Sequence, residues 1–464
     1  QGISSPVGSI LAGMPQPRPA LRFALTTAAA FAGGALSAHL ATATPARESP
    51  YDMLEQLGRA LVLIENEYVE PVDRRRLVEG AIKGMVGELD PHSGYLPPQD
   101  WSIFQSDTEG KFGGVGVEVD FRDDYVMVIA PIEGSPAERA GVRSGDHIIA
   151  IDNKSVADRS PDDLIRTMRG APGSKVVLTI KRAGKDAVLH FTLSREIIEV
   201  ASVAHRLLDD GIGYLRLKQF QSGTHDELLE AAAKLRKENG SELSGVILDL
   251  RNNPGGLVDE ATAIADEFLV HGVIFTTRHR ERVVDEVKAG PGGVLRRGPL
   301  VVLVNEYSAS AAELVAGALQ DNRRGTVVGA KTFGKGSVQT LIDLPGRAGL
   351  RLTTMRYYTP NGRAIQARGV EPDVLVEAAY VADKTFGVIR ESDLENHLPA
   401  EGAPGSGSRP VDAGAVPTDA GAGEAGAGTH LGVSRDIPSD PTGGSDLALS
   451  IGYQIVRGVL KNKP

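Results

Sequence analysis

The chain of 464 residues contains no cysteine. Disulfide bonds, thiol nucleophiles and thiolate metal sites are therefore excluded, although the absence of cysteine does not decide the cellular compartment. Basic residues do not predominate either: 50 lysines and arginines stand against 60 aspartates and glutamates, for a formal net charge of -10. This balance argues against nonspecific binding of nucleic acid.

The remaining composition is that of a globular protein, with 41% hydrophobic and 24% charged residues. The length exceeds that of one ordinary domain and predicts about two to four. Residues 1–50 differ from the rest, because two arginines precede a weakly apolar, alanine-rich stretch and small residues follow it. This leader resembles a bacterial secretory signal, so we expect a periplasmic or otherwise exported protein. An uncleaved inner-membrane anchor ranks lower, because the apolar stretch is short and interrupted; a disordered leader is a third interpretation.

A strand followed by small polar residues marks the part of the chain around which the rest is organised. Residues 301–304 have the length and β-branching of a buried strand, and residues 311–320 have helical composition. Ser308 and Ser310 lie between them, each beside an alanine. A serine at such a turn stands where helix amides point at a bound anion. This position suits a nucleophile whose reaction forms an oxyanion.

A second short strand, residues 326–328, leads into a loop in which Lys335 lies between two glycines. Taken singly, a serine at a helix start is usually an N-cap and a lysine is usually a solvated charge. The loop nearly matches the phosphate motif G-x-x-x-x-G-K-[ST], but Gly336 stands where a magnesium-binding hydroxyl is required. A nucleotide site is therefore not expected.

The two segments together are more specific. Ser-Ala-Ser-Ala-Ala-Glu, followed by Thr-Phe-Gly-Lys-Gly-Ser-Val-Gln, resembles the signature of the carboxyl-terminal processing peptidases, or tail-specific proteases. The resemblance implies Ser310 as nucleophile, Lys335 as general base and Gln339 as the residue that orients the lysine. The serine and lysine are 335 minus 310, or 25, residues apart, which is the family's spacing. It also implies an α/β catalytic domain over residues 196–390, similar to the crotonase and Clp-peptidase spiral, with neither metal nor cofactor.

A lysine base must be neutral to accept a proton. Free lysine titrates near ~10.4, so desolvation has to lower its pKa by roughly two to three for useful catalysis. Phe333 and Val338 are apolar, and no acidic residue lies within three positions of Lys335. The local sequence therefore favours a lowered pKa, which charged tertiary neighbours can still oppose. Gln339 offers a hydrogen bond without adding charge.

Backbone donors must stabilise the oxyanion. One candidate is the amide of Ala311, next to the predicted nucleophile. A second lies in residues 246–257, where a buried strand runs into a Pro-Gly-Gly turn and then a helix. Alone, this is an ordinary strand-to-helix turn. The family carries Asp-Leu-Arg-x-Asn-Pro-Gly-Gly here and uses a glycine amide, which the resemblance places at Gly256, with Gly255 as second choice.

Residues 103–195 predict a small β-rich module with a helix at residues 161–168. The glycine-rich segment Phe-Gly-Gly-Val-Gly-Val and the later Ala-Gly-Val-x-x-Gly-Asp resemble a PDZ domain. Such a loop presents amides to the carboxylate of a peptide that adds to a sheet edge. The loop residues are Gly113, Gly114, Val115 and Gly116. Arg169, just after the helix, is a hypothetical sensor of the bound tail; a solvated arginine is the alternative.

The flanking segments have simpler patterns. Residues 51–98 predict a pair of helices, which in the family often supports self-association. Asp90, His92 and Ser93 have the residue types of a catalytic Ser-His-Asp triad. They are adjacent in sequence, however, and a proline-containing turn is favoured. Residues 400–445 are rich in Gly, Ala, Pro, Ser and Asp and predict disorder. Residues 446–464 predict a C-terminal helix, with apolar Leu447, Ile451, Ile455 and Leu460, that docks on the core or on another subunit.

Three functions are compatible with these patterns. The first is a serine endopeptidase with a Ser-Lys dyad, which cuts proteins whose apolar C-terminal tails enter the PDZ-like groove and which can form homo-oligomers or use an adaptor protein. The second is a tail-binding adaptor without activity, which the intact Ser310, Lys335 and Gln339 argue against. A crotonase-like acyl-CoA enzyme ranks last, because it needs neither the PDZ-like module nor the serine-lysine pair. A Ser-His-Asp hydrolase is also disfavoured, since no histidine lies in a recognisable partner motif.

Overall fold

The computed structural model describes residues 50–122, 124–280, 282–376, 389–401 and 446–461. Most of the predicted leader (1–50) and of the predicted disordered linker (400–445) lies outside them. The chain divides into two compact units, one ending at Val78 and the other beginning at Glu79. None of the helices in the described ranges combines the length and the apolar character needed to cross a bilayer.

The first unit is helical, as the sequence pattern predicts. Helix α2 spans Pro50–Glu67, and helix α3, Arg74–Gly87, begins in this unit. An ion pair of 2.5 Å between Arg74 and Glu65 closes the turn between the two helices. The apolar side chains that predicted α2 are largely exposed in this unit, among them Leu54, Leu57, Ile64 and Tyr68.

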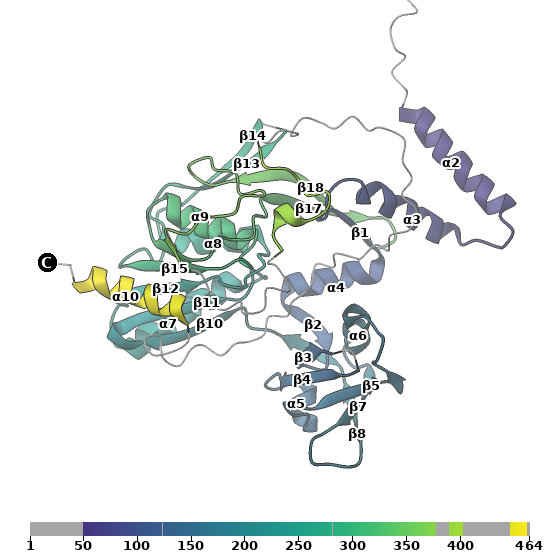
Figure 1. Cartoon of the computed structure of the whole chain (residues 1–464), viewed down its shortest axis with the longest axis horizontal. Coiled ribbons are helices and arrows are strands. Elements are labelled where there is room, and N and C mark those ends of the chain that lie inside the picture. The colour runs from purple at the N-terminus through teal and green to yellow at the C-terminus, as the bar shows by residue number, and fades with distance from the viewer. Residues whose placement is uncertain (1–49, 123, 281, 377–388, 402–445, 462–464) are drawn as a thin grey trace, which may run out of the picture. The chain divides into compact units, whose positions relative to one another are not determined.

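The PDZ-like part of the second unit is an antiparallel sheet in the order β3-β4-β5-β7-β8, with the short β6 paired to β5 (Figure 1). A core of aliphatic side chains lies between this sheet and helices α5 and α6. Strand β3 is at an edge, with β4 as its neighbour. The elements are β3 Val117–Phe121, β4 Val126–Pro131, α5 Pro136–Ala140, β5 His147–Ile151, β6 Lys154–Ser155, α6 Pro161–Met168, β7 Lys175–Lys181 and β8 Leu189–Ser194.

A two-stranded ribbon connects this module to the rest of the unit. Strand β2, Lys111–Gly114, pairs with β9, Glu196–Glu199. The sequence pattern treats Gly113 and Gly114 as loop, whereas both belong to β2. Gly113 is a glycine because of packing: a Cβ there would lie 2.1 Å from the carbonyl oxygen of Gly170.

The catalytic part contains a sheet in the order β10-β11-β12-β15-β16-β19. All neighbours are parallel except β10 and β11. Parallel strands buried on both faces account for the continuous apolar runs in the sequence. The strands are β10 Val203–Leu208, β11 Ile212–Leu217, β12 Gly245–Asp249, β15 Leu300–Val304, β16 Thr326–Gly329 and β19 Val374–Leu375.

Helices cover both faces of this sheet. Alternate side chains of β12, such as Val246 and Leu248, pack with helices α7, α8 and α9 in one core, and Ile247 packs with α10 in another. Figure 1 shows α10 lying along the strands near β12 and β15, which it contacts. The helices are α7 Thr224–Asn239, α8 Val258–Phe268, α9 Ala311–Asp321 and α10 Leu447–Lys461. The catalytic part is thus an α/β domain, as predicted.

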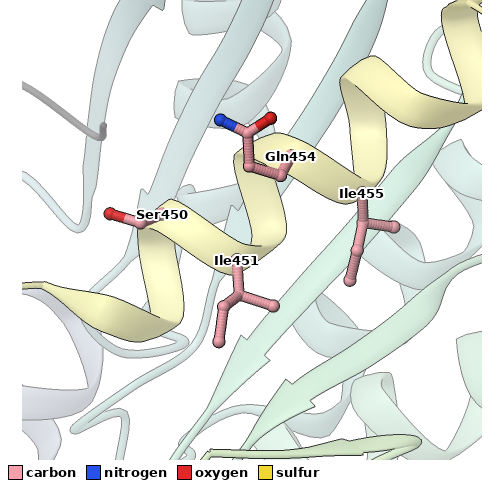
Figure 2. A pocket seen from close by; sticks show the side chains of 4 residues that line it. All are labelled: Ser450, Ile451, Gln454 and Ile455. Carbon is pink, nitrogen blue, oxygen red and sulfur yellow. The ribbon is translucent and has the colours of Figure 1, made fainter.

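Helix α10 docks on the core of its own chain, which settles one of the alternatives left by the sequence. Leu449, Tyr453 and Val456 are buried, and the predicted Ile451 and Ile455 pack partly against the same core, whereas the predicted Leu447 is 55% exposed. Ser450, Ile451, Gln454 and Ile455 line an open hollow of about 440 Å³ along the helix (Figure 2).

A second sheet stands beside the first, in the order β1-β18-β13-β14 with β17 also paired to β18. Its strand β1, Gly94–Leu96, lies in a segment predicted to be helical. Helix α4, Pro98–Glu109, packs on this sheet through Trp101, whose indole N–H donates to Asp343 at 3.0 Å. The other strands are β13 Val273–His279, β14 Arg282–Lys288, β17 Ser337–Leu344 and β18 Ala348–Tyr358.

Candidate active site

Ser310 stands at a sharp turn between β15 and α9. Its backbone has φ 54° and ψ -116°, in the left-handed half of conformational space that costs a non-glycine residue roughly 1–3 kcal/mol. A strained serine at a strand-to-helix turn is typical of an exposed nucleophile. Within the described part of the chain, the Ser310 hydroxyl makes no hydrogen bond. It is therefore free to engage a substrate.

Glu313, in the first turn of α9, joins the serine turn to the lysine loop. Its Oε2 accepts the backbone N–H of Ser310 at 2.8 Å and of Lys335 at 2.9 Å. Its Oε1 accepts the Gly334 N–H at 2.7 Å and the Thr332 hydroxyl at 2.5 Å. The side chain is fully buried, and this desolvation raises the pKa of the Glu313 carboxyl to about 7 despite the four donors.

Glu313 also explains the resemblance to a phosphate loop. The amides of Gly334 and Lys335, which face a bound anion in a nucleotide site, here donate to an internal carboxylate. Gly336 lacks the hydroxyl that would bind magnesium in a nucleotide site. The structure adds an independent reason, since the place of the phosphate is filled.

The glycines on both sides of Lys335 fix its backbone. Gly334 has φ 102°, and its carbonyl accepts the N–H of Ala367 at 2.8 Å. A Cβ on Gly336 would lie 2.3 Å from the backbone nitrogen of Gln366, so no larger residue fits there. The lysine loop is thus held from both ends by contacts that need the Gly-Lys-Gly sequence.

The lysine itself has the lowered pKa that its expected role requires. Desolvation is the main cause and the positive charge of Arg351 the second, and together they lower the pKa of Lys335 to about 8. The acidic neighbours Glu391, Asp90 and Glu313 oppose this shift but do not cancel it. The sequence pattern gives the direction of the shift, whereas Asp90 and Glu391 come from distant segments that it could not identify.

The side chains of Ser310 and Lys335 are not in hydrogen-bond contact in this structure. The Nζ atom of Lys335 has no hydrogen-bond partner in the described residues either. Gln339, on β17, donates to the hydroxyls of Ser337 at 2.9 Å and Thr353 at 3.3 Å rather than bonding to the lysine. The backbone segments at Ser310 and Lys335 are therefore both bonded to Glu313, while the two side chains stay apart.

The Pro-Gly-Gly turn packs directly against the serine. A Cβ on Gly255, which has φ 101°, would lie 2.8 Å from the Cβ of Ser310 and 3.0 Å from the nitrogen of Ala311. The Gly255 N–H is already used, since it donates to Asn253 at 2.9 Å. The N–H groups of Gly256 and Ala311 have no acceptor in the described residues. This difference favours Gly256 over Gly255 as an oxyanion donor.

Buried polar groups hold this turn in place. The hydroxyl of Ser308 donates to the carbonyl of Leu250 at 2.8 Å, and the Ala309 N–H donates to the Asn253 carbonyl at 2.9 Å. The first serine of the Ser-Ala-Ser motif is fully buried, and its bonds are structural. Arg251 pairs with Asp249 at 2.6 Å and with Asp446 at 2.7 Å, which ties the start of α10 to the same turn.

Asp90, His92 and Ser93 form a turn, as the sequence argument favoured. The Asp90 carboxylate accepts the backbone N–H groups of His92 and Ser93 at 2.9 and 3.0 Å and the Ser93 hydroxyl at 2.8 Å. The imidazole of His92 bonds instead to the buried Glu391 at 2.7 Å. A serine-histidine-aspartate relay is absent from this turn.

Arg169 is not a solvated arginine. Its side chain is 9% exposed, pairs with Asp107 of α4 at 2.6 Å, and lies over the ring of Phe112 at 4.4 Å from the centroid. Burial raises the pKa of the Asp107 carboxyl, and Arg169 opposes that rise. The arginine therefore links the end of α6 in the PDZ-like module to α4.

The predicted carboxylate-binding segment is only partly a loop. Gly113 and Gly114 pair with β9, so Val115 and Gly116 alone lie between β2 and the edge strand β3. Val115 is buried, and the Gly116 carbonyl accepts the hydroxyl of Ser135 at 2.9 Å.

Sequence reasoning missed several charged neighbours of the lysine, among them Glu313 and Glu391. Glu313 carried a signal, because Ser310-x-x-Glu313 has the residue types of a capping box. No sequence pattern predicted that Glu391 lies near the lysine, since it belongs to a short turn 56 residues after Lys335 (391 minus 335).

Comparison with known proteins supplies the family. The model of peptidase family S41 matches residues 211–376, a PDZ domain model matches residues 127–182, and the "Activating protease CtpB N-terminal domain" matches residues 23–99. A carboxy-terminal-processing protease of Bartonella bacilliformis is 38% identical over 89% of this chain and 90% of its own length. One from Synechocystis is 39% identical, covering 69% of this chain and 76% of the relative.

A solved photosystem II D1 C-terminal processing protease is 31% identical, with a TM-score of 0.44 over 71% of this chain and 89% of that chain. The extent of the sequence match, together with a PDZ module and a serine and a lysine loop that share one buried carboxylate, identifies the chain as a serine peptidase of the carboxyl-terminal processing family.

Proposed function

We propose that this peptidase cleaves proteins whose apolar C-terminal tails enter the PDZ module, with Ser310 as nucleophile and Lys335 as general base. The observation that carries the proposal is the buried Glu313 carboxylate, which accepts the main-chain N–H of both residues on one oxygen. A lysine pKa of about 8 supports the assignment, because a useful fraction of the side chain is neutral near neutral pH.

The reaction would follow the course of acyl transfer. Neutral Lys335 takes the proton of the Ser310 hydroxyl as the oxygen attacks the scissile carbonyl carbon. The N–H groups of Ala311 and Gly256 then donate to the oxyanion. The resulting ammonium protonates the leaving amine, and a water molecule hydrolyses the ester with the lysine again as base.

The separation of the two side chains implies a closing step before this chemistry. Catalytic hydrogen bonds are often long in the absence of substrate and tighten only when it binds. Gln339 is four residues from Lys335 and lies at the start of β17. We assign it to orienting the lysine in the closed arrangement, where its Oε1 would accept a hydrogen bond from Nζ while its Nε2 keeps its bonds to Ser337 and Thr353.

Tail recognition would use the edge of the PDZ sheet. Strand β3 has an open side on which a peptide can add as a further strand. The segment Gly113, Gly114, Val115 and Gly116 leads into this strand and would present amides to the terminal carboxylate. Arg169 would sense the bound tail, because its ion pair with Asp107 joins the module to α4.

Cleavage of an unstructured protein with an apolar C-terminal tail tests the assignment. Wild type should cleave it, Ser310→Ala and Lys335→Ala should lose activity by more than a hundredfold, and amidation of the tail should slow the wild type. Lys331→Ala is the matched control, since Lys331 lies in the same loop but is 39% exposed and pairs with Glu371. Cleavage that survives Lys335→Ala would exclude the dyad. Tail binding without any cleavage by the wild type would support an adaptor instead.

We further propose self-association and export. The apolar side chains exposed on α2 support self-association through the N-terminal helices. Helix α10 is a weaker candidate, because one face packs on its own sheet. Charged substitutions at Leu54 and Leu57 should lower the mass measured by sedimentation if α2 is the interface. Export rests on the leader of residues 1–50 and is tested by N-terminal sequencing of the protein from the periplasm.

A further inference from the structure

A carboxylate that the proposed mechanism does not use is buried beside the lysine loop. Glu391 lies in a short 3-10 turn, Glu391–Asp393, and is fully buried. Its Oε2 bonds to Nε2 of His92 at 2.7 Å, and its Oε1 accepts from Nε2 of Gln366 at 2.7 Å. Burying a carboxylate is costly unless it is hydrogen-bonded or paired, and these two bonds offset that cost.

One of these bonds leads to the base. The Gln366 side chain uses its nitrogen for Glu391 and its oxygen for the backbone N–H of Gly336, at 3.0 Å. Gly336 directly follows Lys335, and its carbonyl is held by the N–H of Tyr357 at 2.7 Å. The Glu391 carboxylate, with the Leu398 carbonyl that also accepts from Gln366 Nε2 at 3.1 Å, therefore fixes which way the Gln366 amide faces, and this fixes the main chain beside the lysine.

The other bond leads to the charge that lowers the lysine pKa. His92 belongs to the turn after α3, and its carbonyl accepts Nε of Arg351 at 2.7 Å. Arg351 is the charged group that most lowers the pKa of Lys335. The bond from Glu391 to the His92 ring thus anchors the turn that positions Arg351.

The segment that carries Glu391 is itself fastened to the lysine loop. Arg390 donates to the carbonyls of Lys331 at 3.1 Å and Thr332 at 2.8 Å, and the Glu391 N–H donates to the carbonyl of Phe333 at 3.3 Å. Three successive residues before the Gly-Lys-Gly sequence are therefore bonded to two successive residues of this segment.

We propose that Glu391 is a positioning residue for Lys335, acting through Gln366 on the lysine loop and through His92 on Arg351. The inference rests on the proposed role of Lys335 as base. It assigns Glu391 no contact with substrate. It predicts that the carboxylate changes the reaction in two separable ways, by geometry and by charge.

The charge effect has a definite sign. The groups that act on the lysine are Arg351, Glu391, Asp90 and Glu313, and the negative charge of Glu391 raises the pKa of Lys335. Glu391→Gln keeps the shape and removes the charge, so the acidic limb of kcat/KM against pH should move down by about half a pH unit. Arg351→Gln removes the opposing charge and should move the same limb up.

The geometric effect appears when the bonds are lost. Glu391→Ala removes both side-chain bonds, and we expect kcat to fall by about tenfold to a hundredfold with little change in KM. The rate at which a fluorophosphonate labels Ser310 should fall in parallel. Glu395→Gln is the matched control, because Glu395 is exposed on the same segment. Thermal unfolding of each full-length variant shows whether it is folded.

The outcomes separate the two proposals. If Lys335→Ala still cleaves, the dyad itself is wrong. Suppose instead that Lys335→Ala is inactive, but the Glu391 variants have the same kcat and the same acidic limb of the pH profile as the control Glu395→Gln. Glu391 is then not a positioning residue. A fall in melting temperature with unchanged kcat and pH profile would likewise reduce Glu391 to a structural role. The proposal is supported if the acidic limb of kcat/KM against pH moves down for Glu391→Gln and up for Arg351→Gln. A nonspecific loss of structure at the site would not move the limb in opposite directions in the two variants.

Discussion

At the residue scale, groups around Lys335 act on its pKa in opposite directions. Desolvation and Arg351 lower its pKa, while three carboxyl groups oppose them. The sequence predicted the direction of this balance from the absence of nearby acids. It could not predict the opposing charges, because Asp90 and Glu391 lie 245 residues before the lysine (335 minus 90) and 56 residues after it (391 minus 335).

The pH dependence of cleavage should report the lysine directly. Only the neutral form of Lys335 accepts a proton, so kcat/KM should rise with pH and level off above about 8, the pKa of the lysine. Initial rates on a peptide substrate from pH 6 to 10 give the profile. A rate that falls through this range would contradict a lysine base.

The same lysine should weaken the fold. Its pKa is about 8 in the folded chain and near ~10.4 when unfolded, so the cost of burying its charge is present in full below pH 8 and vanishes as pH rises above 10.4. Lys335→Met should therefore be inactive yet more stable at pH 7, by about 1–3 kcal/mol. Urea unfolding at pH 7 and pH 10.5 checks this, because the gain should disappear at the higher pH.

At the element scale, most helices and strands follow from periodicity, and the exceptions have physical causes. The helix at Pro161–Met168 has the predicted bounds. Strand β2 escaped the prediction because its Gly113 satisfies close packing rather than a loop conformation. In α10, Ile451 and Ile455 of the predicted apolar repeat pack partly against the core, whereas Leu447, the first residue of the helix, is exposed.

Helix α10 provides a matched pair of glycine substitutions. A Cβ on Gly452 would lie 3.0 Å from Val301 and 3.1 Å from Leu303, whereas Gly458 has open space around it. Gly452→Leu should destabilise the catalytic part by about 1–3 kcal/mol through overpacking. Gly458→Ala should stabilise it by up to about 1 kcal/mol through helix propensity. Thermal melts of both variants measure the difference; equal shifts would mean that α10 is not packed this closely.

At the scale of the whole molecule, α4 joins the PDZ module to the catalytic sheet. Its Asp107 binds Arg169 of the module, and its Trp101 packs where a Cβ on Gly349 of β18 would lie 2.1 Å from the indole. Strand β18 also carries Arg351 and pairs with β17, which holds Gln339. A continuous set of contacts thus runs from the proposed tail sensor to the strands beside the lysine. These contacts join segments far apart in the chain, so no local pattern predicted them.

Loss of the Arg169 ion pair should uncouple tail binding from cleavage. Arg169→Met keeps much of the contact with Phe112 and removes the charge that pairs with Asp107. We expect the advantage of a free tail over an amidated one to fall by about fivefold or more, a coupling of about 1 kcal/mol. Cleavage of matched substrates with free and amidated tails measures this ratio. Arg166→Met is the control, since Arg166 also pairs with α4, through Asp100, but is 42% exposed; equal ratios in wild type and both variants would exclude a sensor role.

The position of α10 also has a consequence for how the protein is made. The face of the sheet that α10 covers contains Ile212, Tyr214, Ile247, Val301, Leu303 and Val328. A ribosome synthesises these strands before α10. At about 5–20 residues per second, the apolar face of the sheet stays uncovered for several seconds until α10 has been synthesised. Nascent chains that stop before Leu447 should therefore be captured by chaperones or aggregate, even though they carry every residue of the proposed catalytic machinery.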